Sequence, residues 1–204
     1  MKTSRAITAT LTLTVALAVS GCSSDNTPPK DPSTPGATST GTGTAAPSAS
    51  NEPEVPSDWQ TASVGAAQLH VPADWTVTSD GDDSQTMRAP KDAIGISPGF
   101  GNIQANVYRN DGTEDELQEL ADLHEKDLSK DLTNLKRLPD ETINDALFFH
   151  FRGETENKWQ DVYGTLAPEA GDQVTVTWDF NKADIDRKGS ETLIAQIMPT
   201  YKVL

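Results

Sequence analysis

The segment Ser23–Asp58 places the strongest limit on how this chain can fold. Its 36 residues include almost no large apolar side chains. It contains seven Pro, seven Ser, six Thr, four Ala and three Gly, and Val55 is its only large apolar residue. Such a composition cannot bury enough apolar surface to offset the conformational entropy lost on folding. We therefore interpret residues 22–58 as a disordered linker, whose Ser, Thr and Pro content also suits O-linked glycosylation. Residues 59–204 remain as one domain of ordinary size.

The start of the chain has the layout of an export signal. Lys2 and Arg5 form a positively charged n-region, and Ala6–Ser20 follows without a charged residue. This apolar stretch is too short to cross a hydrocarbon core of about 30 Å as a helix, which favours a cleaved signal peptide over a membrane span.

The apolar stretch ends in Val19-Ser20-Gly21-Cys22, and Cys22 is the only cysteine of the chain. This pattern resembles the lipobox of bacterial lipoproteins, which implies a diacylglycerol on the Cys22 thiol and cleavage just before Cys22. Two acyl chains are enough for stable anchoring. We predict that residues 1–21 are a lipoprotein signal peptide and that Cys22 anchors the protein at the extracytoplasmic face of the cell membrane. An ordinary secretory signal with an incidental cysteine is the alternative.

The charge of the chain excludes one class of partner. The whole chain carries 31 acidic and 16 basic residues, a net charge of −15. Residues 59–204 hold 26 acids and 13 bases, so the predicted domain itself carries −13. Nucleic-acid affinity depends on Lys and Arg that neutralise phosphates, so we exclude nucleic acid as a partner. An anionic lipid surface also repels this domain, which leaves lipidated Cys22 as the expected contact with the membrane.

Short alternating segments bounded by Gly, Pro or Asp predict strands, and apolar residues at helical spacing predict two helices. The predicted strands are Gln60–Val64, Gln68–Val71, Trp75–Thr78, Asn102–Asn110, Leu135–Leu138, Ala146–Arg152, Trp159–Leu166, Gln173–Phe180 and a short Thr200–Leu204. The helices are predicted at Thr113–Leu132, with a capping box of Thr113 and Glu116, and at Ser190–Met198.

Two helices among this many strands do not give the alternation typical of a parallel sheet. We therefore predict an α+β domain with a mostly antiparallel sheet. Residues 146–151 are apolar at nearly every position, which predicts a central strand covered on both faces. Ala167–Asp172 is predicted to form a hairpin loop.

This element order resembles the PsbP-like fold, as do the run His70-Val71-Pro72-Ala73-Asp74-Trp75 and the closing Thr200-Tyr201-Lys202-Val203. With the lipobox, the chain is similar to actinobacterial cell-envelope lipoproteins of the LpqN/LpqT type. The resemblance implies an α/β/α sandwich, with helices covering the sheet, and an accessory or binding role. It carries over no functional residue, because none matches position by position.

Gly95-Ile96-Ser97-Pro98-Gly99 matches the G-x-S-x-G pattern of serine hydrolases. The residue after the nucleophile normally donates its backbone N–H to the oxyanion, and Pro98 has no N–H. The segment also leads into a predicted strand rather than a helix. We therefore interpret Ser97 as part of a turn and predict no catalytic residue.

The remaining candidate ligands do not form a recognisable metal or cofactor site. His70, His124 and His150 lack the spacing of a zinc site, so we interpret each as a packed or half-buried side chain. The carboxylates of Asp80–Asp83 lack the spacing of a calcium loop and are interpreted as a solvated turn. No metal or cofactor is predicted.

Asp80–Gly101 reads as a long loop rich in Gly, Pro and Asp, with a strand hint only at Thr86–Arg88. Long loops are often functional, and Trp75, Trp159 and Trp178 would line a pocket beside it unless they belong to the core. Leu123 lies off the apolar stripe of the first helix and is predicted to be exposed.

Three functions are weighed for the domain. The first is a non-catalytic module that binds an envelope or extracellular protein, and the second is a carrier or sensor of a small molecule, lipid or cell-wall fragment. The third, an envelope hydrolase, lacks a nucleophile with a nearby base in the sequence. An apolar pocket of about 300 Å³ or more favours the second function, and a flat apolar patch with a polar rim favours the first.

Overall fold

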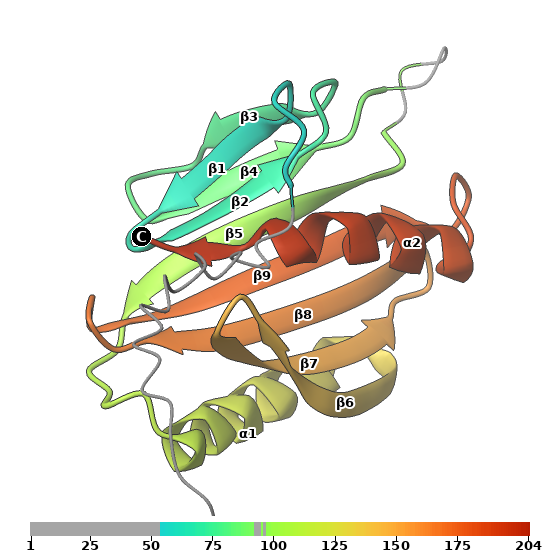
Figure 1. The fold of residues 1–204 in the computed structure, drawn as a ribbon. Helices are drawn as coiled ribbons and strands as arrows, with labels where there is room; N and C mark the ends of the chain where they lie inside the picture. The colour runs from blue at the N-terminus through green and yellow to red at the C-terminus, as the bar shows by residue number, and fades with distance from the viewer. Residues whose placement is uncertain (1–53, 92–94, 96) are drawn as a thin grey trace, which may run out of the picture. The chain divides into compact units, whose positions relative to one another are not determined.

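The computed structural model describes residues 54–91, 95 and 97–204, which form two sheets and two α-helices in those ranges (Figure 1). The small sheet has the order β1-β2-β10, and the large sheet has the order β3-β4-β5-β9-β8-β7-β6. Every strand pair is antiparallel, which confirms the predicted α+β class. The strands are β1 Gln60–Val64, β2 Ala67–Val71, β3 Thr76–Ser79, β4 Ser84–Arg88, β5 Gly99–Val107, β6 Thr133–Ile143, β7 Ala146–Glu154, β8 Lys158–Ala167, β9 Asp172–Asn181 and β10 Lys202–Val203.

Helix α1, Glu114–Asp131, begins where its capping box predicts. The Thr113 hydroxyl accepts from the backbone N–H of Glu116, and the Glu116 carboxylate accepts from the backbone N–H of Thr113. The Thr113 N–H is also the main reason that the pKa of Glu116 lies below its ordinary value. Leu123 is exposed on the outer side of this helix, as predicted.

Helix α2, Arg187–Ile197, begins three residues earlier than predicted, at Arg187 rather than Ser190. The reason is its N-cap: the Asp186 carboxylate accepts from the backbone N–H of Gly189 at 2.7 Å. A 3₁₀ turn, η1 (Met198–Thr200), with Pro199 inside it, then leads into β10.

The two helices lie on opposite faces of the large sheet, and the small sheet shares the face of α2 (Figure 1). The α1 face buries a compact cluster of Leu117, Leu120, Ala121, Phe149, Phe151 and Val162. The other face holds the larger core, whose biggest fully buried side chains include Trp178, Tyr201, Phe148 and Phe180.

The prediction of a central strand at residues 146–152 is half right. Strand β7 is buried on both faces, because Phe149 and Phe151 face α1 while Phe148 enters the larger core. Its place in the sheet is not central, since β7 is the neighbour of the edge strand β6, and β9 is the middle strand. The helices on both sides of the sheet cause its burial.

The prediction of a long loop over Asp80–Gly101 is wrong in part: the strand hint at Thr86–Arg88 belongs to β4, and the range ends inside β5. Strand β4 lies inside this range and pairs with both β3 and β5, so the segment contributes an interior strand to the sheet. Trp75 and Trp178 meet edge to face in the core, with ring centroids 6.2 Å apart, so these two tryptophans belong to the core. Trp159 is half-buried elsewhere, where its ring lies beneath the Lys182 ammonium at 4.3 Å.

The predicted signal peptide and lipid attachment at Cys22 lie outside the described residues, as does most of the predicted linker. Among the residues that are described, no helix is long and apolar enough to cross a membrane. The domain boundary at residue 59 stays a prediction.

Candidate functional site

The large sheet splits between β7 and β8 at one end. The ladder between these strands stops at the pair of Phe149 and Gly164, whereas β8 stays paired with β9 as far as Ala167 and Asp172. The first residues of β7 remain paired with β6 instead, through Ala146 and Ile143. The tip of the β6–β7 hairpin, residues 143–146, is therefore not part of the β7–β8 ladder, whereas β8 continues its pairing with β9.

Contacts made by the turn at the hairpin tip keep this tip in place beside the split. Asn144 and Asp145 both have left-handed φ angles, 45° and 69°, as the tight turns of hairpins require. The Asn144 side-chain amide donates to the backbone carbonyls of Pro199 and Tyr201, at 2.8 Å each. These two bonds tie the tip to the segment that follows α2.

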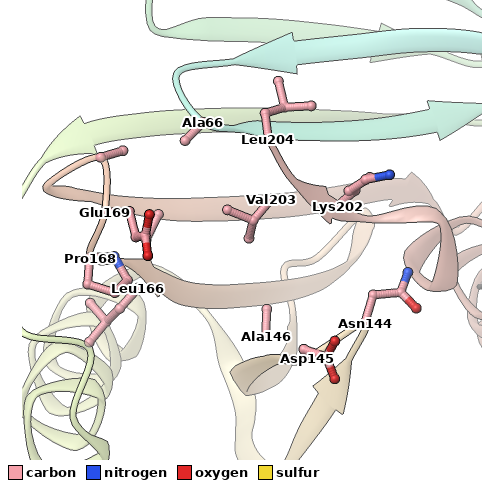
Figure 2. Close-up of a pocket in the computed structure, with 12 residues that line it drawn as sticks. Ala66, Asn144, Asp145, Ala146, Leu166, Pro168, Glu169, Lys202, Val203 and Leu204 are labelled. Atoms are coloured by element: carbon pink, nitrogen blue, oxygen red, sulfur yellow. The ribbon is translucent and has the colours of Figure 1, made fainter. Parts of the chain in front are cut away.

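A groove of about 890 Å³ opens beside the split (Figure 2). Figure 2 shows that residues from the β1–β2 turn, the hairpin tip, the β8–β9 turn and the last residues of the chain surround it. Its lining residues are Ala66, Asn144, Asp145, Ala146, Leu166, Ala167, Pro168, Glu169, Ala170, Lys202, Val203 and Leu204. Eight of these twelve are apolar, and the volume lies within the range of small-molecule sites.

The groove also holds two of the four large apolar side chains that are exposed in the described residues. Val203 is 38% and Leu204 is 64% exposed, and both line the groove. The backbone N–H of Leu204 donates to the Ala66 carbonyl at 2.7 Å, which fixes this segment beside the β1–β2 turn. An apolar ligand in the groove would remove these side chains from water, which is favourable.

A buried ionic cluster lies on the α2 face of β7 and β8. The Nε2 atom of His150 lies 2.8 Å from Oδ1 of Asp161, whose side chain is almost fully buried. Nε of Arg152 donates to the same oxygen at 2.9 Å, and Nη2 of Arg187 lies 2.9 Å from Oδ2. The Arg187 contact is an ion pair without hydrogen-bond alignment.

This cluster contains the histidine and carboxylate of a hydrolase but not its remaining geometry. The other ring nitrogen of His150, Nδ1, faces Glu141 at 3.6 Å. Both ring nitrogens thus face carboxylates, and neither is directed at a hydroxyl. The His150 ring also stacks on Tyr163, with centroids 3.9 Å apart, which fixes it in the sheet.

The other candidates from the sequence occupy structural positions. The Ser97 hydroxyl donates to the carbonyls of Ala89 and Gly99, at 2.8 and 3.0 Å, and so closes the connection between β4 and β5. His70 is half-buried between the side chains of Thr61 and Gln68. Burial, and secondarily the nearby Lys202 charge, lowers the pKa of His70.

His124 packs against Phe149 with ring centroids 5.2 Å apart, as predicted for a residue on the apolar stripe of α1. In the Asp80–Asp83 turn, the Asp80 carboxylate accepts a hydrogen bond from the Thr86 hydroxyl. No group of three or more metal-ligating side chains occurs in the part of the chain that the structure describes.

The groove was not foreseen from the sequence. Its lining comes from separate turns and ends of strands, of which only the hairpin loop at Ala167–Asp172 was predicted. Four of its twelve lining residues are alanines, which give little sequence signal.

Comparisons with known proteins bear on the fold. No family model matches the chain, and no curated protein matches its sequence. The solution structure of cyanobacterial PsbP (CyanoP) from Synechocystis sp. PCC 6803 is similar to it, with a TM-score of 0.50 and 12% sequence identity. The match covers 78% of this chain and 100% of that chain. This chain has a PsbP-like fold.

Two further structures are more distant. A protein from Bacteroides thetaiotaomicron VPI-5482 gives a TM-score of 0.41 at 14% identity, over 70% of this chain and 47% of that chain. This chain thus spans about half the length of that protein. The protein of unknown function PA94 from Pseudomonas aeruginosa gives 0.39 at 13% identity, over 68% and 93%. Both TM-scores are below 0.5, so neither structure supports a statement about this chain. The finer resemblance to envelope lipoproteins stays a prediction.

Proposed function

We propose that this chain is a membrane-tethered, extracytoplasmic binding protein that acts without catalysing a reaction, and that its ligand lies in the groove. The groove carries the proposal, because it joins a volume of about 890 Å³ to a mainly apolar lining and two exposed apolar side chains. The proposed tether rests on the export-signal pattern and Cys22.

Of the two binding functions, the groove favours a carrier or sensor of a small molecule, lipid or cell-wall fragment. A hollow of this size encloses a ligand of moderate size, whereas a protein partner normally needs a broader contact surface. The lining is mainly apolar, and the charged Asp145, Glu169 and Lys202 also belong to it. Such an arrangement suits a ligand with an apolar part and a polar end.

A protein-binding module is the second candidate. The exposure of Leu204 supports it, because a side chain 64% exposed is accessible to an apolar side chain of a partner. In that case the groove would receive one anchoring residue of an envelope or extracellular protein, as interface hot spots do. The contacts of Ser97 and His150 support either binding function over hydrolysis.

Binding of Nile red, a neutral apolar fluorophore, tests the groove directly. We expect the full chain to bind the dye and Leu204→Asp to weaken binding at least about tenfold, because a carboxylate disfavours an apolar ligand. Leu123→Asp is the matched control, since Leu123 is a similarly exposed leucine on α1, outside the groove. Equal dye binding by the two variants would show that the groove is not the ligand site.

Detergent phase partition in the native host tests the tether. Cys22→Ser should leave the protein in the aqueous phase, because the variant lacks the thiol that would carry the lipid. The unmodified chain should enter the detergent phase. A variant that enters detergent as completely as the unmodified chain would refute the lipid anchor.

Crosslinking in intact cells separates the two binding functions. A photoreactive residue at position 204 should label a low-molecular-mass ligand if the chain is a carrier, and one specific protein if it is an adaptor. The same group at position 123 controls for random encounters. Reproducible esterase, glycosidase or peptidase turnover by the purified chain, lost on one substitution, would overturn the non-catalytic proposal.

A further inference from the structure

A second cavity, of about 700 Å³, lies between the β6–β7 hairpin and helix α2 with η1. It shares only Asn144 with the lining of the groove, so the two sites can be tested separately. Its lining residues are Glu141, Thr142, Ile143, Asn144, His150, Arg152, Tyr163, Glu191, Ile194, Ala195, Met198 and Pro199.

One part of this lining is apolar and the other part is charged. The residues from α2 and η1 that line it include Ile194, Ala195, Met198 and Pro199, and Ile143 from the hairpin adds to them. The strands β6, β7 and β8 contribute Glu141, His150, Arg152 and Tyr163. A ligand here would therefore meet hydrocarbon from one direction and ionisable groups from the other.

Arg152, which lines this cavity, and the neighbouring Arg187 are both paired with carboxylates. Arg152 contacts Asp161 at 2.9 Å and Glu191 at 2.8 Å. Arg187 contacts the same two carboxylates, at 2.9 and 3.3 Å. Two positive and two negative charges balance here, so the arginines offer little to an anionic ligand.

Glu141 is a further negative charge at this cavity, in addition to the two carboxylates that pair with the arginines. Its carboxylate lies 3.6 Å from Nδ1 of His150, beyond hydrogen-bond distance, and its side chain is 46% exposed. Among the described residues, no Lys or Arg forms an ion pair with Glu141, and a carboxylate in such a partly apolar cavity favours a cation because the interaction strengthens as water is excluded. The charge of −13 on residues 59–204 adds to this by raising the local concentration of cations.

We propose that this cavity is a second binding site, which takes an organic cation with an apolar body. The ammonium group lies against the Glu141 carboxylate and donates hydrogen bonds to it, and the apolar body packs against Ile194, Ala195 and Met198. This site goes beyond the proposed function of the groove and does not depend on it.

A titration of the ¹⁵N-labelled full chain with n-hexylamine, followed by amide NMR shifts, tests the proposal. 1-Hexanol and hexanoate have the same apolar body with a neutral and an anionic head. We expect n-hexylamine at pH 7 to bind at least about tenfold more tightly than either, because only its head is a cation. The largest shifts should fall on Thr142, Ile194 and Ala195, and Leu166 and Val203 in the groove should stay unchanged.

Two variants and a control test whether n-hexylamine binds in this cavity. Glu141→Gln keeps the shape of the side chain and should weaken n-hexylamine binding about tenfold while leaving 1-hexanol unchanged. Glu169→Gln, at the groove, is the matched control and should bind as the unmodified chain does. Ala195→Trp, at an exposed helical position, should block the cavity and remove binding even if Glu141→Gln fails to fold.

Three results would each overturn the proposal. These are 1-hexanol or hexanoate binding as tightly as n-hexylamine, shifts centred on Leu166 and Val203, and n-hexylamine binding that survives Ala195→Trp unchanged. Loss of Nile red binding in Leu204→Asp leaves these results untouched, so failure at one site is distinguishable from failure at the other.

Discussion

The side-chain amide of Asn144 donates to the backbone carbonyl of Tyr201 at 2.8 Å, joining positions 57 residues apart in the sequence. A second bond from the same amide reaches the Pro199 carbonyl. Asn144 also lines both the groove and the second cavity, so its hydrogen bonds fix the position of a residue that the two sites share. The hairpin tip is therefore both a structural tie and a boundary of the binding surfaces.

Asn144→Gly should lower the free energy of unfolding by about 1–2 kcal/mol, because it removes two hydrogen bonds while still allowing the left-handed backbone. Asp145→Gly is the control, since Asp145 has a similar φ and no such bonds among the contacts described. It should change stability by less than about 1 kcal/mol. Urea denaturation measures both, and equal losses in the two variants would mean that the Asn144 bonds contribute nothing.

Asp161→Asn should destabilise the domain by about 3 kcal/mol or more, because it leaves Arg152 and Arg187 without one of their buried counter-charges. Asp74→Asn, at an exposed turn, should stay within about 0.5 kcal/mol. Denaturant midpoints compare the two. A loss at Asp161 no greater than at Asp74 would show that the cluster does not stabilise the fold.

The parts of the fold that local chemistry determines were predictable from the sequence. Helix α1 combines an apolar stripe with a capping box, and both signals lie within one segment. The strands with strict alternation, such as β1 and β9, were predicted close to their observed ends. Strand β4 was only hinted at, over Thr86–Arg88, because Met87 is its one buried residue and its alternation is weak.

The sites were not predictable, because they depend on contacts between distant residues. The split between β7 and β8 has no sequence signal, since β7 is apolar at nearly every position from 146 to 151 and this pattern does not change where its pairing with β8 stops. The ionic cluster joins residues from two strands and α2, which lie apart in the sequence. Only the pairing of strands brings Arg152 opposite Asp161.

Leu120→Asp should destabilise the domain by several kcal/mol, on the order of 3, because it places an unpaired charge against Phe149 and Phe151. Asp122→Ala should stay within about 0.5 kcal/mol: its contact with Arg137 spans 3.7 Å and its side chain is 77% exposed. Thermal or chemical unfolding gives both values. Two variants of equal stability would contradict the way α1 packs on the sheet.

Lowering the pH should weaken the fold through His124. Burial against the sheet lowers the pKa of His124, and the negative charge of Asp127 opposes this only in part. An unfolded chain takes up a proton at this residue near pH 6.5, as an exposed histidine does, whereas the folded chain does so only at lower pH. The stability contributed by the neutral ring is therefore complete above about pH 6.5 and is lost as the pH falls toward the folded pKa.

His124→Gln removes this contribution, so its free energy of unfolding should fall less between pH 7.5 and about 5.5 than that of the unmodified chain. This window lies above the ordinary pKa range of exposed carboxylates. His70→Gln is a useful companion, because the pKa of His70 is lowered in the same direction by burial and Lys202. Urea titrations at several pH values give the slopes. If His124→Gln loses stability as steeply as the unmodified chain, the His124 ring is not held neutral by its packing on Phe149.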